Sequence, residues 1–201
     1  DTPMDISSLK AKRRYEITKG LRNFEVKQIT PGDFGEQLFV ITVKAYESWP
    51  AKYRPVVERE TFIRGINDWK DKKVYGGFHK EGRELCAYAL LTPGDDYIEF
   101  NVLRVIPEQE KNAINAAMVY SILTDNKQFR YINDGSRSIR HETAFQDYLE
   151  KYFGFRKAYC KLHVTYRPGM KLLIKLLYPL RNYMPSIVAS ILRMEEILRY
   201  E

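Results

Sequence analysis

The stretch VIPEQEKNAINAAMVYSIL, residues 105–123, decides the fold that we expect for this chain. It begins at the end of a β-rich run and passes through Pro107, whose fixed φ and missing N–H suit the first turn of a helix. Apolar residues then recur at helical spacing, so the stretch predicts a helix over 108–123. These residues are Ile114, Ala117, Met118 and Ile122. A strand that runs directly into a helix is a building unit of α/β proteins.

Three short β-rich runs lie upstream and cover residues 73–80, 84–91 and 97–106. The tripeptide Glu81-Gly82-Arg83 separates the first two, and a Pro-Gly-Asp-Asp turn over 93–96 precedes the third. Gly and Pro at such places are turn signals. The runs therefore predict a hairpin that is extended by a third antiparallel strand.

The residues before the hairpin predict one strand and two helices. Both helices have apolar residues at near-helical spacing, and Pro50 ends the first of them. The predicted elements are a strand over 24–29 and helices over 34–49 and 56–69. Residues 1–12 have little apolar periodicity, and we expect them to form a loose arm.

After the central stretch, the chain predicts a strand over 129–132, a helix over 141–152 and a long final strand over 155–166. Gly154 is expected to close the helix, because glycine readily adopts the left-handed conformation at a helix end. The element order is then β, α, α, β, β, β, α, β, α, β. It predicts an α/β (α+β) fold with a mixed, mostly antiparallel central sheet and helices on both faces.

The final part of the chain, residues 168–201, predicts a separate helical extension. Pro179 and Pro185 divide it into two helices, each with an apolar face. We therefore expect one domain over residues 1–167 and a basic C-terminal helical pair over 168–201. The pair could contact a membrane surface, mediate a homodimer or pack on its own domain.

The charge of the chain is unevenly distributed. The net charge of the 201 residues is +7, and residues 155–201 hold nine basic and three acidic side chains. Residues 31–154 hold 17 basic and 19 acidic side chains, so the body of the chain is nearly neutral. A nucleic-acid-binding domain would more often carry positive charge on its body, and we therefore expect no nucleic-acid partner.

No apolar run reaches the length of a membrane span, and the hydrophobic fraction of 44% is ordinary for a globular protein. Cys86 and Cys160 each lie in an apolar run, which favours free buried thiols over a disulfide. We therefore expect a cytoplasmic protein.

The element order, together with residues 105–155, resembles the GNAT superfamily of N-acetyltransferases, and the likeness covers about residues 24–167. In that family the third strand of the meander splays from its neighbour, and acyl-CoA enters the gap. A glycine-containing loop at the start of the next helix holds the pyrophosphate through backbone amides. A helix N-terminus suits this, because its free N–H groups and its dipole both favour an anion. The resemblance implies acetyl-CoA or another acyl-CoA as the cofactor.

The family's loop pattern is Arg or Gln, two spacers, Gly, one spacer, then Gly or Ala, and it falls on EKNAIN, residues 110–115. Both glycines are absent here, and Glu110 stands at the leading basic position. The amides can still donate, although each Cβ narrows the approach to a phosphate and Glu108 and Glu110 oppose an anion. The implied cofactor-binding residues are Val105, Gln109, Lys111, Asn112, Ala113, Ile114, Asn115 and His141.

Glu99 and Tyr148 are the catalytic residues that the resemblance implies. Glu99 lies on the third meander strand, where several family members carry a glutamate that takes the proton of the amine. Its alternative role is that of an outward-facing strand residue. Tyr148, in HETAFQDY at 141–148, is similar to the tyrosine that protonates the departing thiolate in many members. It could instead be a half-buried helix aromatic, and Tyr152 could hold its position, because Tyr148 lies further from Gly154 than is usual.

The polar loop NDGSRSIR, residues 133–140, supplies candidate substrate-binding residues just after a strand end. Arg137 and Arg140 could bind a phosphate or carboxylate in a bidentate manner, and Asp134 lies beside them in the loop. An ordinary polar surface loop is the alternative. His141 could neighbour a helix N-cap, act as a base or be solvated.

The sequence predicts no metal site, nucleophile elbow, P-loop or dinucleotide fingerprint. We therefore expect an N-acyltransferase that moves an acetyl or related acyl group to a small-molecule or peptide amine. The alternative is a non-catalytic scaffold with the same fold, whose basic tail binds a membrane surface or a protein partner.

Overall fold

The computed structural model describes residues 6–49, 51, 54–135, 144–158, 164–185, 188–189, 191–192 and 195. The chain forms two compact units, residues 1–135 and 136–201. The first unit contains the whole sheet, and the second contains helices. The expected boundary at residue 167 stays a prediction.

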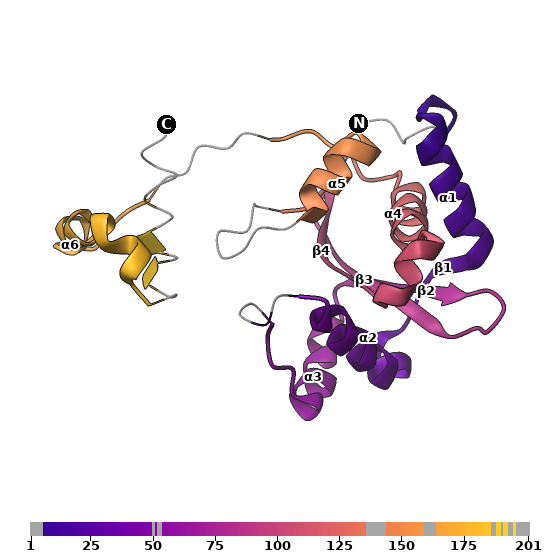
Figure 1. The fold of residues 1–201 in the computed structure, drawn as a ribbon, viewed down its shortest axis with the longest axis horizontal. Helices are drawn as coiled ribbons and strands as arrows, with labels where there is room; N and C mark the ends of the chain where they lie inside the picture. Colours follow the sequence, from indigo (N-terminus) through magenta and orange to yellow (C-terminus); the bar gives the residue numbers. More distant parts are fainter. Residues whose placement is uncertain are drawn as a thin grey trace. The chain divides into compact units, whose positions relative to one another are not determined.

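The first unit is built on a five-stranded sheet in the order β1-β2-β3-β4-β5 (Figure 1). The first four strands form an antiparallel meander, and β5 pairs with β4 in parallel. The strands are β1 (Phe24–Gln28), β2 (Lys73–His79), β3 (Leu85–Pro93), β4 (Tyr97–Val105) and β5 (Tyr131–Asn133). The expected hairpin, its third strand and the mixed, mostly antiparallel sheet are confirmed.

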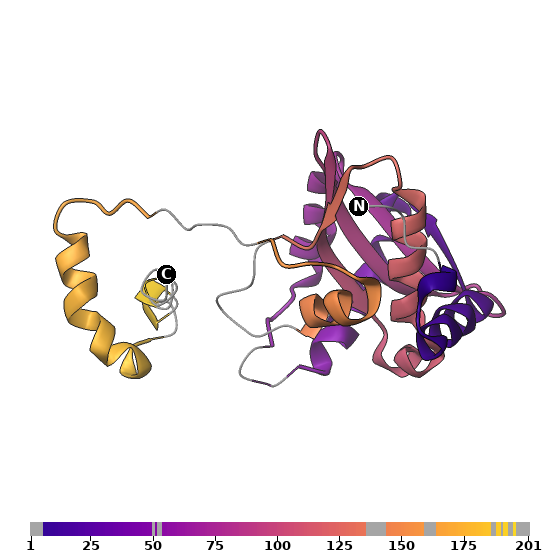
Figure 2. The ribbon, with the colours of Figure 1, turned by 90° about the horizontal axis from the view of Figure 1, so that it is seen from above.

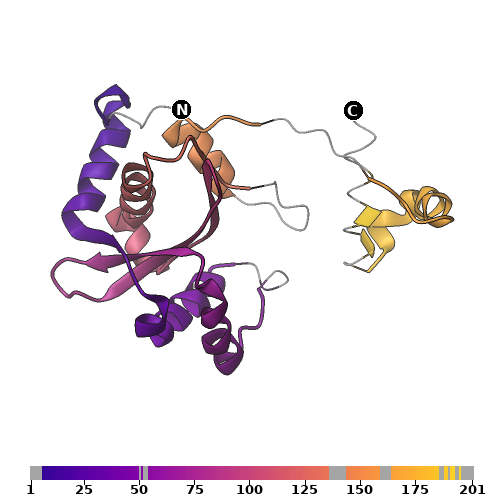
Figure 3. The same cartoon turned by 180° about the vertical axis from the view of Figure 1, so that it is seen from behind.

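Helices cover both faces of this sheet, as expected (Figures 1 and 3). One face is covered by α4 (Ile114–Asp125), with α1 (Ala11–Asn23) packed beside it. The other face is covered by α2 (Gly35–Glu47) and α3 (Arg59–Gly65). Because both faces are covered, the middle strands β2 and β3 are almost continuously buried rather than alternating.

Each face has its own packing. On the α2 face, Leu38 and Ile41 lie in a buried cluster with Phe78 and Tyr88 of the sheet. On the α4 face, Gly77 gives room for Met118, since a Cβ on Gly77 would lie 2.8 Å from the Met118 sulfur. The periodic apolar residues of both helices thus form the core that the sequence predicted.

Helix α1 is the main element that the sequence analysis missed. It begins at Ala11, inside the segment expected to be a loose arm, and a short 3-10 helix covers Ile6–Ser8. Gly20 allows the helix to approach α4 closely, because a Cβ there would lie 2.4 Å from the Ala113 carbonyl oxygen. The position of α1 is therefore fixed by a contact with residues far along the chain.

The second unit contains α5 (Ala144–Phe153) and α6 (Met170–Leu177), and a 3-10 helix over Tyr178–Tyr183 continues from α6 (Figure 2). Gly154 follows α5 with a φ of 69°, which confirms it as the residue that closes the helix. The first tail helix is confirmed by α6. Most of the second, expected after Pro185, lies outside the described residues.

The prediction of a long final strand over 155–166 is wrong for the part of that range that the structure describes. Residues 155–158 and 164–166 carry no strand, and the Phe155 N–H instead donates to the Leu149 carbonyl at 3.3 Å. Alternating apolar residues show that a segment is extended, but they do not supply a neighbouring strand with which it can pair.

Candidate functional site

The outer edge of β4 is paired over only part of its length. Tyr97, Ile98 and Glu99 pair with Tyr131, Ile132 and Asn133 of β5. β5 ends at Asn133, so its pairing with β4 ends at Glu99, and in the described part of the sheet no strand pairs with Asn101 to Val105 on that side. From Glu99 onward, β4 continues toward the turn before α4.

The turn that leads into α4 differs from the single helix expected over 108–123. A 3-10 helix covers Pro107–Asn112, and α4 begins only after Ala113, whose φ is 65° and ψ is 33°. This left-handed conformation favours glycine, because the Cβ of other residues is crowded there. Ala113 thus holds the backbone shape that a glycine would normally supply.

This break leaves N–H groups available at the start of α4. The Ala117 N–H makes the first helical bond, to the Ala113 carbonyl at 3.1 Å. The N–H groups of Ile114, Asn115 and Ala116 precede it in the first turn, where a helix provides no acceptors. Together with the helix dipole, they form a place that favours an anion.

Two side chains of α1 donate hydrogen bonds to backbone carbonyls of this turn. Lys19 Nζ donates to the Lys111 carbonyl at 2.8 Å, and Asn23 Nδ2 donates to the Asn112 carbonyl at 3.3 Å. These contacts were not expected. The only sequence signal for them is that Lys19 and Asn23 lie four residues apart, on one face of a helix.

The side chains of the turn have mixed charge, and one side-chain amide is bonded internally. Asn112 Nδ2 donates to Gln109 Oε1 at 2.8 Å, so this amide is bonded within the turn. Lys111 is exposed and brings a positive charge, whereas Glu108 and Glu110 bring negative charge to the preceding 3-10 helix. The turn therefore combines a left-handed backbone at Ala113 with one positive and two negative side chains.

Glu99 lies where β4 and β5 part. It is partly exposed, its Oε1 accepts a hydrogen bond from Asn101 Nδ2 at 3.0 Å, and it lies opposite Thr92 of β3. A Cβ built on Gly135 would lie 3.2 Å from Glu99 Oε1, so the segment after β5 passes close to this carboxylate. Asp134 lies in the same segment and is partly buried.

Tyr148 belongs to the second unit, where it lies in an aromatic cluster of α5. Its ring centroid is 6.4 Å from that of Phe145, 5.2 Å from Tyr152 and 5.6 Å from Phe153. Tyr148 and Tyr152 are partly exposed, while Leu149 and Phe153 are buried. Arg137, Arg140 and His141 lie outside the described residues. Glu99 and the residues from Val105 to Asn115 thus follow one another along β4, the turn after it and the start of α4, all in the first unit.

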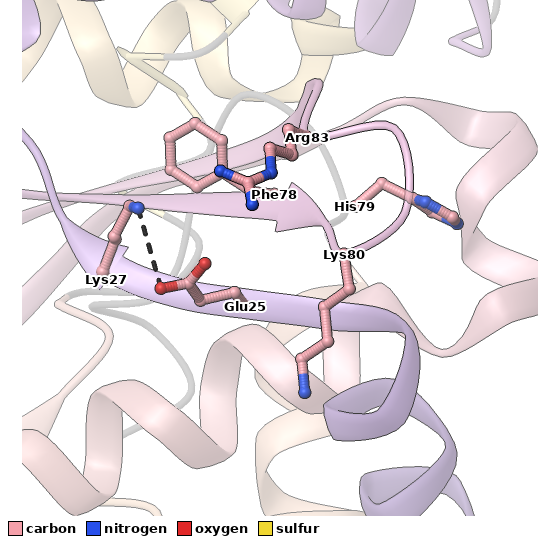
Figure 4. A pocket seen from close by; sticks show the side chains of 6 residues that line it. All are labelled: Glu25, Lys27, Phe78, His79, Lys80 and Arg83. Atoms are coloured by element: carbon pink, nitrogen blue, oxygen red, sulfur yellow. Dashed lines mark ion pairs between the residues drawn. The ribbon is translucent and has the colours of Figure 1, made fainter.

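A surface depression of about 440 Å³ lies at the opposite edge of the sheet, between β1 and the turn after β2 (Figure 4). Two of its cations are engaged: Lys27 lies 3.6 Å from Glu25 and 4.8 Å from the centre of the Phe78 ring, and Lys80 donates to the Leu21 carbonyl. It is lined by Glu25, Lys27, Phe78, His79, Lys80 and Arg83. We assign no chemistry to it.

Three buried groups elsewhere in the first unit have a structural role. Burial raises the pKa of the Tyr75 and Tyr88 phenols and of the Cys86 thiol. Cys86 is free and buried, as expected, and Cys160 lies outside the described residues. Within the described ranges, no group of three metal-ligating side chains is present, and no helix has both the length and the apolar content needed to cross a bilayer.

Comparison with known proteins adds evidence on the fold. The chain matches no protein-family model and no curated protein sequence. It is similar to the solved structure of a ribosomal-protein-alanine N-acetyltransferase from Brucella melitensis biovar Abortus 2308, with a TM-score of 0.54 at 8% identity. That likeness covers 71% of this chain and 99% of the other.

Two further structures give the same result. A probable acetyltransferase is similar at a TM-score of 0.52 and 16% identity, over 72% of this chain and 98% of the other. A possible acetyltransferase from Clostridium difficile 630 is similar at a TM-score of 0.51 and 9% identity, over 72% of this chain and 99% of the other.

This chain has a GNAT-like fold, the fold of these acetyltransferase structures.

Proposed function

We propose that this chain is a cytoplasmic, acyl-CoA-dependent N-acyltransferase, which moves an acetyl or related acyl group to the amine of a small molecule or peptide. One juxtaposition carries the proposal. The pairing of β4 with β5 ends at Glu99, and β4 then leads to the left-handed turn at Ala113 and the first turn of α4. A strand that runs into a helix N-terminus suits a ligand with a diphosphate and an extended acyl arm.

In this proposal the first turn of α4 binds the pyrophosphate. The N–H groups of Ile114, Asn115 and Ala116 would donate to its oxygens, and the exposed Lys111 would offset part of its charge. Ala113 would set the shape of the turn. Val105, Gln109 and Asn112 would flank the cofactor, and His141 stays a candidate from the sequence alone.

The chemistry requires one proton acceptor and one proton donor. The bound acyl-CoA would supply a thioester, whose carbonyl carbon is attacked by the nitrogen of the acceptor amine. Glu99 would accept the proton that this nitrogen loses, directly or through a water molecule. Tyr148 belongs to the second unit and stays a candidate from the sequence for donating its phenolic proton to the sulfur as the C–S bond breaks, with Tyr152 as the alternative donor. Asp134, Arg137 and Arg140 stay candidates for contact with the acceptor.

Isothermal titration and thermal unfolding with acetyl-CoA test this proposal. We expect binding heat and an increase in Tm for the full chain. In Glu99→Gln, binding should persist while the acetylation of amines slows, and Glu25→Gln on the edge strand β1 is the matched control. The absence of both binding heat and a Tm shift at millimolar acetyl-CoA would contradict the proposal.

A second candidate function is contact with an anionic membrane surface through residues 168–201. Leu172 and Leu176 of α6 are 65% and 66% exposed, whereas Ile174 between them is buried. Residues 167–183 contain four basic side chains and no acidic one. An apolar face flanked by cations is typical of helices that lie in a membrane interface.

Co-sedimentation with vesicles tests this candidate. Vesicles that contain phosphatidylglycerol should pellet the chain, and vesicles of phosphatidylcholine alone should not. The double substitution Leu172→Glu and Leu176→Glu should abolish pelleting, and Lys171→Gln with Lys175→Gln should weaken it. Equal pelleting by both kinds of vesicle, or a dimer that the leucine substitutions dissolve, would count against membrane contact.

A further inference from the structure

Arg104 of β4 is a partly buried cation without a carboxylate partner. It lies opposite Tyr88 of β3, on the sheet face that α2 covers. In the part of the chain that the structure describes, no ion pair involves Arg104. By contrast, Arg13, which is 6% exposed, lies 2.5 Å from Glu16. Partly desolvated charges are normally paired, so the missing anion at Arg104 needs an explanation.

The contacts of the guanidinium with the protein are neutral and incomplete. Arg104 Nη2 donates to the Tyr46 hydroxyl at 3.0 Å, and Nη1 donates to the Leu103 carbonyl at 3.2 Å. Nε is buried and has no hydrogen-bond partner. Since a guanidinium has five N–H groups, these bonds leave part of its donor set unused.

Two aromatic rings frame this cation. The Arg104 Cζ lies 4.8 Å from the centre of the Tyr46 ring and 5.5 Å from that of Trp49, and the two rings meet edge to face. Such rings fix the plane of a guanidinium and leave its N–H edge to bind a planar anion. We call Arg104, Tyr46 and Trp49 the arginine cluster.

The Tyr88 phenol, opposite Arg104 on β3, does not neutralise it. The Thr42 hydroxyl lies 2.7 Å from the Tyr88 hydroxyl and donates its hydrogen to the Leu38 carbonyl at 2.7 Å. Tyr88 must therefore be the donor to Thr42 and keep its proton. Burial also raises the pKa of Tyr88, so this phenol stays neutral at physiological pH.

The arginine cluster lies on the same sheet face as the proposed general base. Arg104 pairs with Tyr88 and Glu99 pairs with Thr92, and these two β3 residues are four positions apart, hence on one face. On β4 the two residues are five apart, because a β-bulge opposite Leu90 and Leu91 adds one residue to that strand. The separation along the strand is about 14 Å, which the two side chains can shorten. An acceptor of about three extended residues could reach from one to the other.

From these observations we propose that the arginine cluster binds a carboxylate or phosphate at the far end of the acceptor, and so selects amines that carry an anionic group. This inference rests on the proposed acyl transfer. It adds the substrate class and names Arg104 as the residue that determines specificity. Both anions have the oxygen geometry that a guanidinium binds in a bidentate manner.

Matched acceptors test the proposal with the full chain and acetyl-CoA. Triglycine is compared with triglycine amide, and 6-aminohexyl phosphate with 6-aminohexanol, so that each pair differs only in the anionic group. The wild-type chain should show a KM about tenfold lower for the anionic member of at least one pair, because hydrogen bonds to charged groups are stronger than neutral ones. The pair that shows the difference identifies the anion as carboxylate or phosphate.

Three variants separate recognition from a structural role. Arg104→Gln should raise the KM of the anionic acceptor to that of its neutral counterpart, and Arg104→Lys should restore part of the preference. Arg64→Gln, on the exposed surface of α3, should keep it. Equal KM values within both pairs for the wild type, or a preference that survives in Arg104→Gln, would overturn the proposal. A lower Tm with an unchanged preference would assign Arg104 a structural role only.

A binding measurement separates this inference from the proposed acyl transfer. If acetyl-CoA does not bind, the transfer proposal fails, but triglycine should still raise the Tm of the wild type more than triglycine amide does. That difference should disappear in Arg104→Gln. If neither peptide nor either hexyl compound changes the Tm while acetyl-CoA binds, the anion site is wrong and acyl transfer stands.

Discussion

Ala113→Gly is the substitution that most directly tests the turn before α4. An L-residue in the left-handed conformation costs about 1–2 kcal/mol, and glycine removes this cost. Glycine also gives the unfolded chain more freedom, which costs about 0.4–1 kcal/mol. We therefore expect the free energy of unfolding to stay equal or to rise by about 1 kcal/mol, an unusual result for a helix-start Ala→Gly change.

Ala116→Gly is the matched control, because it makes the same chemical change three residues later, in the first turn of α4. Ala116 is buried, and glycine in place of alanine in a helix costs up to about 1 kcal/mol, to which the lost methyl burial adds about 0.8 kcal/mol. Urea unfolding should therefore separate the two variants by about 2 kcal/mol. A loss of stability in Ala113→Gly as large as in Ala116→Gly would refute the left-handed turn. Under the proposed function, Ala113→Gly should also tighten the binding of acetyl-CoA, because the Cβ no longer limits the approach of a phosphate.

Three other predictions follow from the same structure. Gly20→Val should destabilise the chain by about 1–3 kcal/mol in urea unfolding, because the new side chain would meet the Ala113 carbonyl; an unchanged midpoint would contradict the α1–α4 contact. Glu99→Gln should lower kcat for amine acetylation by about 100-fold at neutral pH without weakening acetyl-CoA binding, and an unchanged kcat would remove Glu99 from the mechanism. Stability should fall above about pH 10: the raised pKa values of Tyr75 and Tyr88 mean that the unfolded chain loses these protons first. Tyr88→Phe should flatten this alkaline loss, and an identical pH profile would show that the phenol does not contribute.

Much of the candidate site could be located from the sequence. The β-rich run at 97–106 placed Glu99 on the third meander strand, and Pro107 marked the start of the turn that follows. These predictions succeed because strand alternation and proline geometry act within a few residues. From the absent glycines, the sequence predicted a loop that departs from the family's pattern. In the structure, Ala113 nevertheless adopts the left-handed backbone conformation.

Contacts between distant segments could not be predicted in this way. Arg104 donates to Tyr46 across 58 residues of sequence, and Lys19 reaches the Lys111 carbonyl across 92 residues. Neither pair has a spacing that links its members. The missed helix α1 has the same cause, because its place depends on how closely Gly20 can approach Ala113.

The amino-acid sequence alone was enough to predict the local elements: the hairpin, the third strand, the helices over 34–49 and after Pro107, and the helix closed by Gly154. Each of these depends on φ preferences and on the period of apolar residues, which are properties of neighbours in the chain. Tertiary packing fixes where β5 stops pairing with β4, how Ala113 comes to hold a left-handed turn, and which side chains surround Arg104. Those outcomes depend on which surfaces are brought together when the core packs, because a backbone strain or an unpaired charge persists only where the surrounding contacts fix it.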